Sequence, residues 1–157
     1  MSSIPPSYDQ DFYGWLQQQA NLLRSGRLQD LDVVHLLEEI EALGRSEKRA
    51  LIAQLARLYL HLLKWHYQAS LRSPSWLISI ENARDEITDL LEDNPSFQAD
   101  LDQSIAKAYA KGRKQAHLET GLPIERFPAD NPFSFETAMT LKLGGSAESA
   151  NILEPNP

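Results

Sequence analysis

The sequence of 157 residues contains no cysteine. This absence excludes disulfides, thiolate metal ligands and cysteine nucleophiles, and it makes a reducing cytoplasm the simplest setting. The sequence also lacks any apolar run of the roughly 18 residues needed to span a bilayer. Its first residues have neither the basic nor the apolar segment of a secretion signal. We therefore expect a soluble, cytoplasmic protein that does not enter a membrane.

The motifs of several common enzyme classes are missing as well. There is no Gly-x-Ser-x-Gly nucleophile elbow, no P-loop and no His-Glu-x-x-His zinc motif. A dimetal site in a helical bundle uses Glu-x-x-His on two helices, whereas His35 and Glu38 stand in the reverse order. We predict no metal and no cofactor. A site built by three histidines from different helices remains geometrically possible.

What the chain does carry is 42% hydrophobic residues and a net charge of −7. At this length, such a composition favours one globular domain with a sizeable core. The acidity opposes nucleic-acid binding at long range, although two basic stretches, 44–75 and 107–118, could form a local patch. The second stretch is typical of a helix C-terminus, where cations complement the helix dipole. We therefore expect no nucleic-acid partner.

Apolar residues recur at helical spacing, and no segment alternates as a strand would. The pattern predicts an all-α fold, an antiparallel bundle of four main helices near 8–24, 31–67, 76–92 and 96–118. Helix boundaries are marked by Ser7 with Gln10, which resemble a capping box, and by Asp30 or Asp32 before the second helix. Ser25-Gly26 should end the first helix.

The second helix has the most informative pattern. One face carries Val33, Leu37, Ile40, Leu51, Leu55, Leu58 and Leu62, and we expect that face to be buried against other helices. Gly44 weakens the helix, and Ser46 just beyond it can cap a restarted helix. A kink near residues 43–46 is therefore predicted. At the far end, Trp65 and Trp76 should be buried and anchor the next turn.

After the fourth helix the pattern becomes irregular. Residues 122–133 should form a strap that packs Phe127 and Phe133 over the bundle, followed by a short helix at about 134–141. The domain organisation that we predict is a flexible leader at 1–7, a single helical domain at 8–143 and a mobile tail at 144–157.

Four polar residues are candidates for a site: Glu39, His61, Arg84 and Glu119. His61 lies one helical turn before Trp65, beside the apolar face, where a histidine held by one hydrogen bond is the structural interpretation. In the alternative, His61 pairs with Glu39 or Glu119 and acts as a base. Arg84 could form a buried bidentate pair with either glutamate and so fix the helix register.

Six segments then suggest a family. In order they are EEIEALGRSEK at 38–48, HLLKW at 61–65, RSPSW at 72–76, NPSF at 94–97, AHLETGLP at 116–123 and FP at 127–128. Together they resemble the bacterial family called domain of unknown function 29, common in cyanobacteria, from about Tyr8 to Met139. The resemblance implies an all-helical domain. It implies no activity, because the family is named for lacking one.

Two functional hypotheses follow. The first is a non-enzymatic helical module that binds an unknown protein partner and can form a homo-oligomer, since the chain has ample apolar positions and no complete catalytic constellation. The second is a small metal- or acid/base-dependent enzyme that uses His61 with Glu39, Arg84 or Glu119. Nucleic-acid binding comes third because of the acidity.

Overall fold

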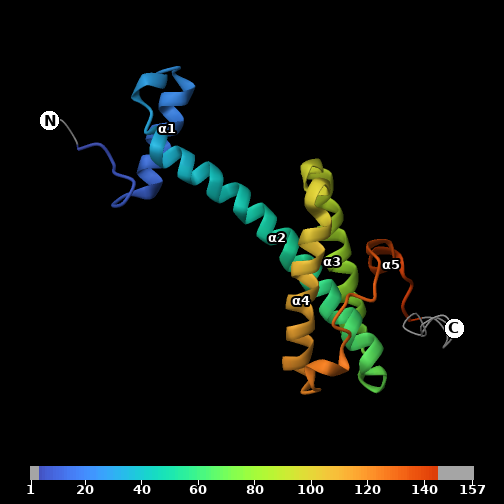
Figure 1. Cartoon of the computed structure of the whole chain (residues 1–157). Helices are drawn as coiled ribbons and strands as arrows, with labels where there is room; N and C mark the ends of the chain where they lie inside the picture. The colour runs from blue at the N-terminus through green and yellow to red at the C-terminus, as the bar shows by residue number, and fades with distance from the viewer. Residues whose placement is uncertain (1–3, 145–157) are drawn as a thin grey trace. The chain divides into compact units, whose positions relative to one another are not determined.

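The computed structural model describes residues 4–144, and the regular structure in this range is entirely helical. The elements, in chain order, are α1 (Phe12–Arg24), η1 (Leu28–Asp30), α2 (Val33–Tyr67), η2 (Ala69–Leu71), α3 (Pro74–Asp93), η3 (Pro95–Asp100), α4 (Leu101–Thr120), η4 (Ile124–Arg126) and α5 (Phe135–Thr140) (Figure 1). The predicted all-α fold and its long helices are confirmed. None of the helices in 4–144 is long and apolar enough to cross a membrane.

The chain divides into two compact units, Met1–Ser46 and Glu47–Pro157, called unit 1 and unit 2 below. The boundary falls within α2, so each unit contains about half of that helix. The single domain that we expected at 8–143 stays a prediction. Residues 1–3 of the predicted leader and 145–157 of the predicted tail lie outside the described residues.

Unit 1 begins with a capped turn. The Ser7 hydroxyl accepts a hydrogen bond from the Gln10 amide at 3.1 Å, but this turn precedes the helix. Asp11 is the actual N-cap of α1, because its carboxylate accepts from the Gly14 amide at 2.9 Å. Helix α1 therefore starts at Phe12 and not at Tyr8. It ends at Ser25 as predicted, with Gly26 in the left-handed region at φ +70°.

Helix α2 is continuous. Asp32 precedes it and accepts from the His35 amide at 3.4 Å, so one of the two predicted caps is confirmed. The helix runs without a break through Gly44, and the restart that we predicted at Ser46 is wrong. A single helical glycine removes no backbone hydrogen bond, and its intrinsic penalty of about 1 kcal/mol is too small to break a helix of 35 residues.

Unit 2 is a helical bundle in which α3 and α4 pack on the second half of α2 (Figure 1). Gly112 of α4 sits directly on α2, since a Cβ atom added there would lie 2.8 Å from the Ala56 carbonyl oxygen. The two backbones therefore approach closely. The core of the bundle consists of aliphatic and aromatic side chains from α2, α3, α4 and the segment after α4, including Leu51, Leu55, Leu58, Tyr59, Leu62, Leu63, Ile80, Ile87, Tyr109, Phe127 and Phe133.

The strap at 122–133 covers this core. Phe127 and Phe133 are 1% and 3% exposed, which confirms the predicted packing. Side chains of α4 hold the strap by its backbone: the Tyr109 hydroxyl donates to the Pro128 carbonyl, and Arg113 donates from Nε to the Phe127 carbonyl at 3.1 Å. The same guanidinium reaches the Ile124 carbonyl at 3.1 Å through Nη2. The irregular segment is thus fixed through main-chain oxygens.

The two predicted tryptophan anchors differ. Trp65 is buried, as expected, and the Arg72 guanidinium lies 4.8 Å from its ring centre. Trp76 is only half-buried. The Lys64 ammonium lies 4.7 Å from the centre of the Trp76 ring, so this tryptophan packs under a charged side chain at the surface of unit 2.

The apolar face of α2 is buried along only part of its length. Leu51, Leu55, Leu58 and Leu62 are fully buried in unit 2, as predicted. In unit 1 the prediction is wrong, because Val33, Leu37 and Ile40 are 64%, 53% and 64% exposed. At 100° per residue, His35 lies about 160° from Val33 around the helix, and the N-terminal segment and α1 contact α2 on the His35 side.

Candidate functional site

An apolar groove of about 300 Å³ lies on unit 1, where the end of α1 meets the start of α2. Its lining is aliphatic throughout and consists of Leu23, Leu31, Val33, Leu36, Leu37 and Ile40. Five further large apolar side chains of unit 1 are more than half exposed: Ile4, Tyr13, Leu28, Val34 and Leu43. Exposed apolar residues are normal when scattered, but a contiguous set on one helix face is typical of an interaction surface.

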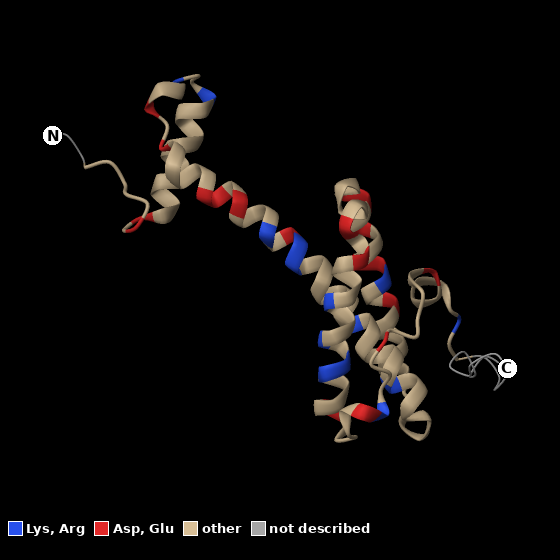
Figure 2. Cartoon of the chain, viewed as in Figure 1, with Lys and Arg blue, Asp and Glu red and all other residues tan. Residues whose placement is uncertain are grey.

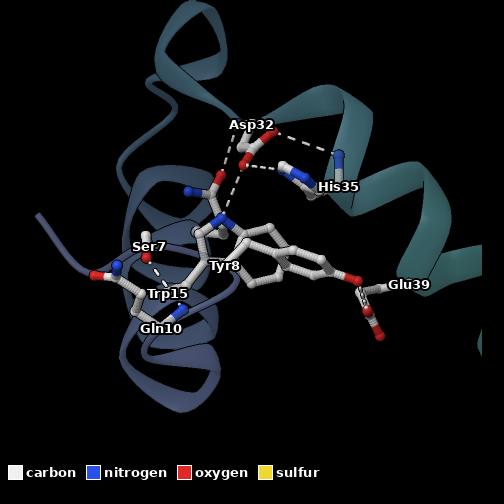
Figure 3. Close-up of polar contacts among 8 residues, drawn as sticks. Ser7, Tyr8, Gln10, Trp15, Asp32, His35 and Glu39 are labelled. Atoms are coloured by element: carbon white, nitrogen blue, oxygen red, sulfur yellow. Dashed lines mark hydrogen bonds and ion pairs between the residues drawn. The ribbon is translucent and has the colours of Figure 1, made fainter.

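A polar and aromatic cluster lies on the other side of α2 in unit 1, and Figure 3 shows it. Asp32 is its centre. The Asp32 carboxylate accepts from His35 Nδ1 at 2.7 Å and from Trp15 Nε1 at 3.0 Å. The Asp32 amide donates to Gln19 Oε1 at 2.8 Å. Trp15 and Gln19 are the buried residues of α1, so this hydrogen-bond network fastens α1 to the start of α2.

Tyr8 adds the N-terminal segment to the cluster. Its ring stacks on the His35 ring at a centroid distance of 4.1 Å and meets the Trp15 ring edge-on at 4.9 Å. The Tyr8 hydroxyl donates to Glu39, one helical turn beyond His35 (Figure 3). One ring therefore contacts both helices of unit 1, and its hydroxyl uses the glutamate that we had considered for catalysis.

These contacts change the acidity of the groups involved. The hydrogen bond with Asp32 raises the pKa of His35, and the hydrogen bond from His35 lowers the pKa of Asp32. The hydrogen bond to Glu39 raises the pKa of Tyr8 to about 12. The pair thus favours a protonated imidazole beside an ionised carboxylate.

The predicted site residue His61 lies in unit 2 and is half-buried. Its Nδ1 donates to the Arg57 carbonyl at 2.8 Å, and burial lowers its pKa. Glu119 on α4 accepts from Lys64 Nζ at 3.1 Å and from Gln115 at 3.3 Å. Partial burial opposes ionisation of Glu119, but the two hydrogen bonds together with the charges of Lys64 and His61 outweigh it and lower the pKa of Glu119. Glu119 is thus paired with Lys64, while His61 bonds its own helix.

Arg84 does not make the predicted pair with Glu39 or Glu119. Its side chain is buried, and Nη1 contacts Glu81, one turn earlier in α3, at 2.7 Å. The other nitrogens donate to carbonyls of the C-terminal segment: Nε to Ala138 and Nη2 to Leu141, both at 2.9 Å. Arg84 therefore holds α5 against α3. Hydrogen bonds from a side chain to main-chain carbonyls cannot be predicted from a sequence pattern, because every residue has the same carbonyl oxygen.

The four candidates accordingly have separate hydrogen-bond partners, although Glu119 lies near enough to His61 for the charge of each to act on the pKa of the other. Glu39 belongs to unit 1, whereas His61, Arg84 and Glu119 belong to unit 2, where each is engaged in the contacts described above. Within residues 4–144, no group of three or more His, Asp or Glu side chains is arranged to hold a metal ion. The described part of the chain thus offers a network of structural polar contacts and an exposed apolar groove.

Comparison with known protein families identifies the family of this chain. The sequence profile of the family described as "Domain of unknown function DUF29" matches residues 7–142. The chain belongs to this family. The search of curated proteins and the search of solved structures found no match to this chain. Membership of DUF29 therefore agrees with the all-helical fold and assigns no activity.

Two features of the site were missed from the sequence. The exposed groove was missed because helical periodicity identifies an apolar face but not whether another element covers it. The Asp32 network was recognised only in parts, as a helix cap and a candidate histidine. The spacing Asp32-x-x-His35 at a helix start is a usable signal, because residues three apart on a helix are neighbours. Tyr8 and Gln19 carry no such signal.

Proposed function

We propose that this protein is a non-enzymatic protein-interaction module, and that the groove of unit 1 binds an amphipathic helix of a protein partner. The observation that supports this most strongly is the exposure of Leu37 and Ile40 at 53% and 64% on a well-formed helix. Exposed aliphatic residues at i, i+3, i+4 and i+7 are how one helix presents itself to another. Burying them on a partner would be favourable by about 25 cal/mol per Å² of apolar surface.

The polar residues support the same proposal. Asp32 and Gln19 fix α1 against the start of α2, and Tyr8 fixes the N-terminal segment, so the groove is formed before a partner arrives. A preformed surface loses less conformational entropy on binding than a flexible one. Acid–base chemistry has weaker support, because Arg84 is committed to Glu81 and two carbonyls while Glu119 is paired with Lys64.

The experiment that tests this function places a photo-cross-linking amino acid at Leu37, in cells that naturally make the protein. We expect a discrete covalent adduct with a protein. The matched control is the same amino acid at Tyr13, which is 72% exposed on α1 and outside the groove. Adducts absent at Leu37, or equal at both positions, would refute the proposal.

A further inference from the structure

Unit 1 has a second cavity, on the side of α2 that carries His35. It has a volume of about 370 Å³ and lies between the N-terminal segment, α1 and the start of α2. His35 and Ile40 are five residues apart, about 140° around the helix, so this cavity and the apolar groove are on different faces of α2. We call it the acidic cavity, and its wall includes Pro5, Pro6, Asp9, Gln19, Asp30 and Asp32.

The wall of the acidic cavity is rich in hydrogen-bond acceptors. Asp9, Asp30 and Asp32 contribute three carboxylates. Pro5 and Pro6 have no backbone N–H group, so the main chain of these two residues offers only carbonyl oxygens. Unit 1 as a whole contains seven Asp and Glu residues and three Arg residues (Figure 2). An occupant that donates hydrogen bonds and carries positive charge would therefore complement this wall.

One of the three carboxylates lacks a counter-charge. Asp30 pairs with Arg27 at 2.8 Å, and Asp32 pairs with His35 at 2.7 Å. Within residues 4–144, the Asp9 side chain has neither an ion pair nor a hydrogen bond. One uncompensated carboxylate matches an occupant with one positive charge.

The charge of Asp9 also acts on the two rings at the cavity. The pKa of Tyr8 is raised mainly by its hydrogen bond to Glu39, and the charge of Asp9 adds to this shift. The pKa of His35 is raised mainly by its hydrogen bond with Asp32, and the charge of Asp9 adds to this shift as well. The electrostatic potential that Asp9 creates around both rings is therefore negative, which favours a cationic occupant.

The buried amide of Gln19 is an independent sign of an occupant. Gln19 is 4% exposed, and its Oε1 accepts a hydrogen bond from the Asp32 amide at 2.8 Å. Its amide nitrogen has no partner among residues 4–144, and it is not fully enclosed, so it keeps some accessible surface at the cavity that Gln19 lines. A buried N–H donor without an acceptor costs free energy. Gln19 therefore points to an occupant that also carries an acceptor atom.

An arginine within a peptide combines both features. Its guanidinium carries one positive charge and five N–H donors, and the peptide backbone next to it supplies carbonyl oxygens. We propose that the acidic cavity binds an arginine of a peptide segment, with its guanidinium against Asp9 and a peptide carbonyl on the Gln19 amide. This inference goes beyond the groove, because the two surfaces lie on different faces of α2 and each can be occupied alone.

The first test titrates the full chain with N-acetyl-L-arginine amide and follows the tryptophan indole N–H signals by NMR. Of the three tryptophans only Trp15 lines the cavity, and its Nε1 donates to Asp32 at 3.0 Å. We expect a saturable shift of the Trp15 signal and no shift of the Trp65 and Trp76 signals.

The matched control compound is N-acetyl-L-citrulline amide, which has the same shape and no charge. It should bind about tenfold more weakly, because the charge-assisted hydrogen bonds are lost. Equal affinity for the two compounds, or a Trp15 signal that does not shift, would overturn the proposal.

The second test removes the uncompensated charge. Asp9→Asn should weaken the binding of N-acetyl-L-arginine amide about tenfold. The variant should fold normally, because the Asp9 side chain bonds to nothing within residues 4–144. The matched control is Glu41→Gln, which removes an exposed carboxylate of unit 1 outside the cavity and should leave the dissociation constant unchanged. Equal losses in the two variants would mean that only the net charge of unit 1 matters, and would contradict the contact with Asp9.

The third test distinguishes an arginine of a peptide from a free cation. Propylguanidinium has the same charged group and no carbonyl, so it leaves the Gln19 amide without an acceptor. It should bind several-fold more weakly than N-acetyl-L-arginine amide. If propylguanidinium binds as tightly or more tightly, the cavity accepts free cations and the assignment to a peptide is wrong.

The acidic cavity and the groove can be tested separately. Ile40→Glu changes the groove and should leave the affinity for N-acetyl-L-arginine amide unchanged. A covalent adduct at Leu37 in cells, without binding of N-acetyl-L-arginine amide, overturns the inference about the cavity and keeps the interaction module. Binding of N-acetyl-L-arginine amide without an adduct at Leu37 has the opposite meaning.

Discussion

The two halves of α2 have the same apolar spacing and opposite surroundings. In unit 2 the leucines at 51, 55, 58 and 62 are fully buried by α3, α4 and the strap. In unit 1 the residues at 33, 37 and 40 are more than half exposed, because α1 and Tyr8 contact the other side of the helix. The comparison shows that periodicity defines a face, while burial depends on which elements fold over it. The same apolar pattern is thus buried as a core in one unit and exposed at the surface in the other.

The largest expected effect is a difference between two leucines of that face. Leu55→Ala should lower the free energy of unfolding by about 2–5 kcal/mol, because it removes buried apolar surface and leaves a cavity. Leu37→Ala should change it by less than about 0.5 kcal/mol, since the side chain is 53% exposed. Urea denaturation, at concentrations where the protein is monomeric, measures both. Equal losses would mean that Leu37 is covered in the isolated chain and that the contrast between the units is wrong.

A smaller effect is expected at the helix crossing in unit 2. Gly112→Ala should destabilise the protein by about 1–3 kcal/mol, because the new Cβ would lie 2.8 Å from the Ala56 carbonyl oxygen and 3.1 Å from the Leu60 nitrogen. Both are backbone atoms that cannot rotate away. Thermal unfolding followed by circular dichroism would show the loss, and an unchanged midpoint would show that α4 can move off α2 without penalty.

Replacement of Gly44 in unit 1 should change the free energy of unfolding in the opposite direction. Gly44→Ala meets nothing within 4 Å and should stabilise the monomer by about 0.5–1 kcal/mol, the intrinsic helix preference of alanine over glycine. Urea denaturation of the variant and of the parent protein measures the change. Destabilisation of the monomer would mean that the glycine has a role within the chain.

The subtlest contrast concerns pH. In unit 1 the pKa of His35 is raised in the folded state. The contribution of His35 to the free energy of unfolding is therefore present below a pH of about 6.5 and is lost as the pH rises through the folded-state pKa. In unit 2 burial lowers the pKa of His61 and His66, so stability is lost as the pH falls below about 6.5 towards their folded-state pKa. Protection factors from amide hydrogen exchange should therefore change in opposite directions in α1 and α4.

Two variants check the origin of this contrast. Asp32→Asn should abolish the pH dependence in unit 1 only, since Asp32 supplies the hydrogen bond that raises the pKa of His35. His66→Phe should reduce the dependence in unit 2 only, because an apolar ring in the same place does not titrate. Parallel changes in both units would show that a global charge effect dominates over the individual histidines.

Most of the fold could be predicted from the sequence, because its signals are local. The end of α1 was marked by Ser25-Gly26, and Gly26 has a positive φ there. The packing of Phe127 and Phe133 was also predicted, since large aromatic residues in an otherwise polar segment are expected to seek a core. The start of α1 was misplaced by four residues, because Ser7 caps a turn instead of the helix.

The site could not be predicted in the same way, because its contacts are not local. Arg84 donates to carbonyls 54 and 57 residues away, and Tyr8 donates to a carboxylate 31 residues away. Neither partner has a pattern that distinguishes it from other carbonyls or glutamates. The pairing of His61 with Glu39 or Glu119 was an inference about proximity. The structure gives His61 Nδ1 the Arg57 carbonyl, and it places Glu119 near enough for its charge to act on the pKa of His61.

The recognition of the strap through its main chain has a consequence for sequence variation. Tyr109, Arg113 and Arg84 bind carbonyl oxygens of the segment from Ile124 to Leu141, and any amino acid at those positions would present the same oxygen. The strap and the short helix after it are therefore free to drift in sequence, apart from the few side chains that enter the core. The residues whose identity matters are the three donors, which lie on α3 and α4. Among relatives, we expect these donors to vary less than the segment that they hold.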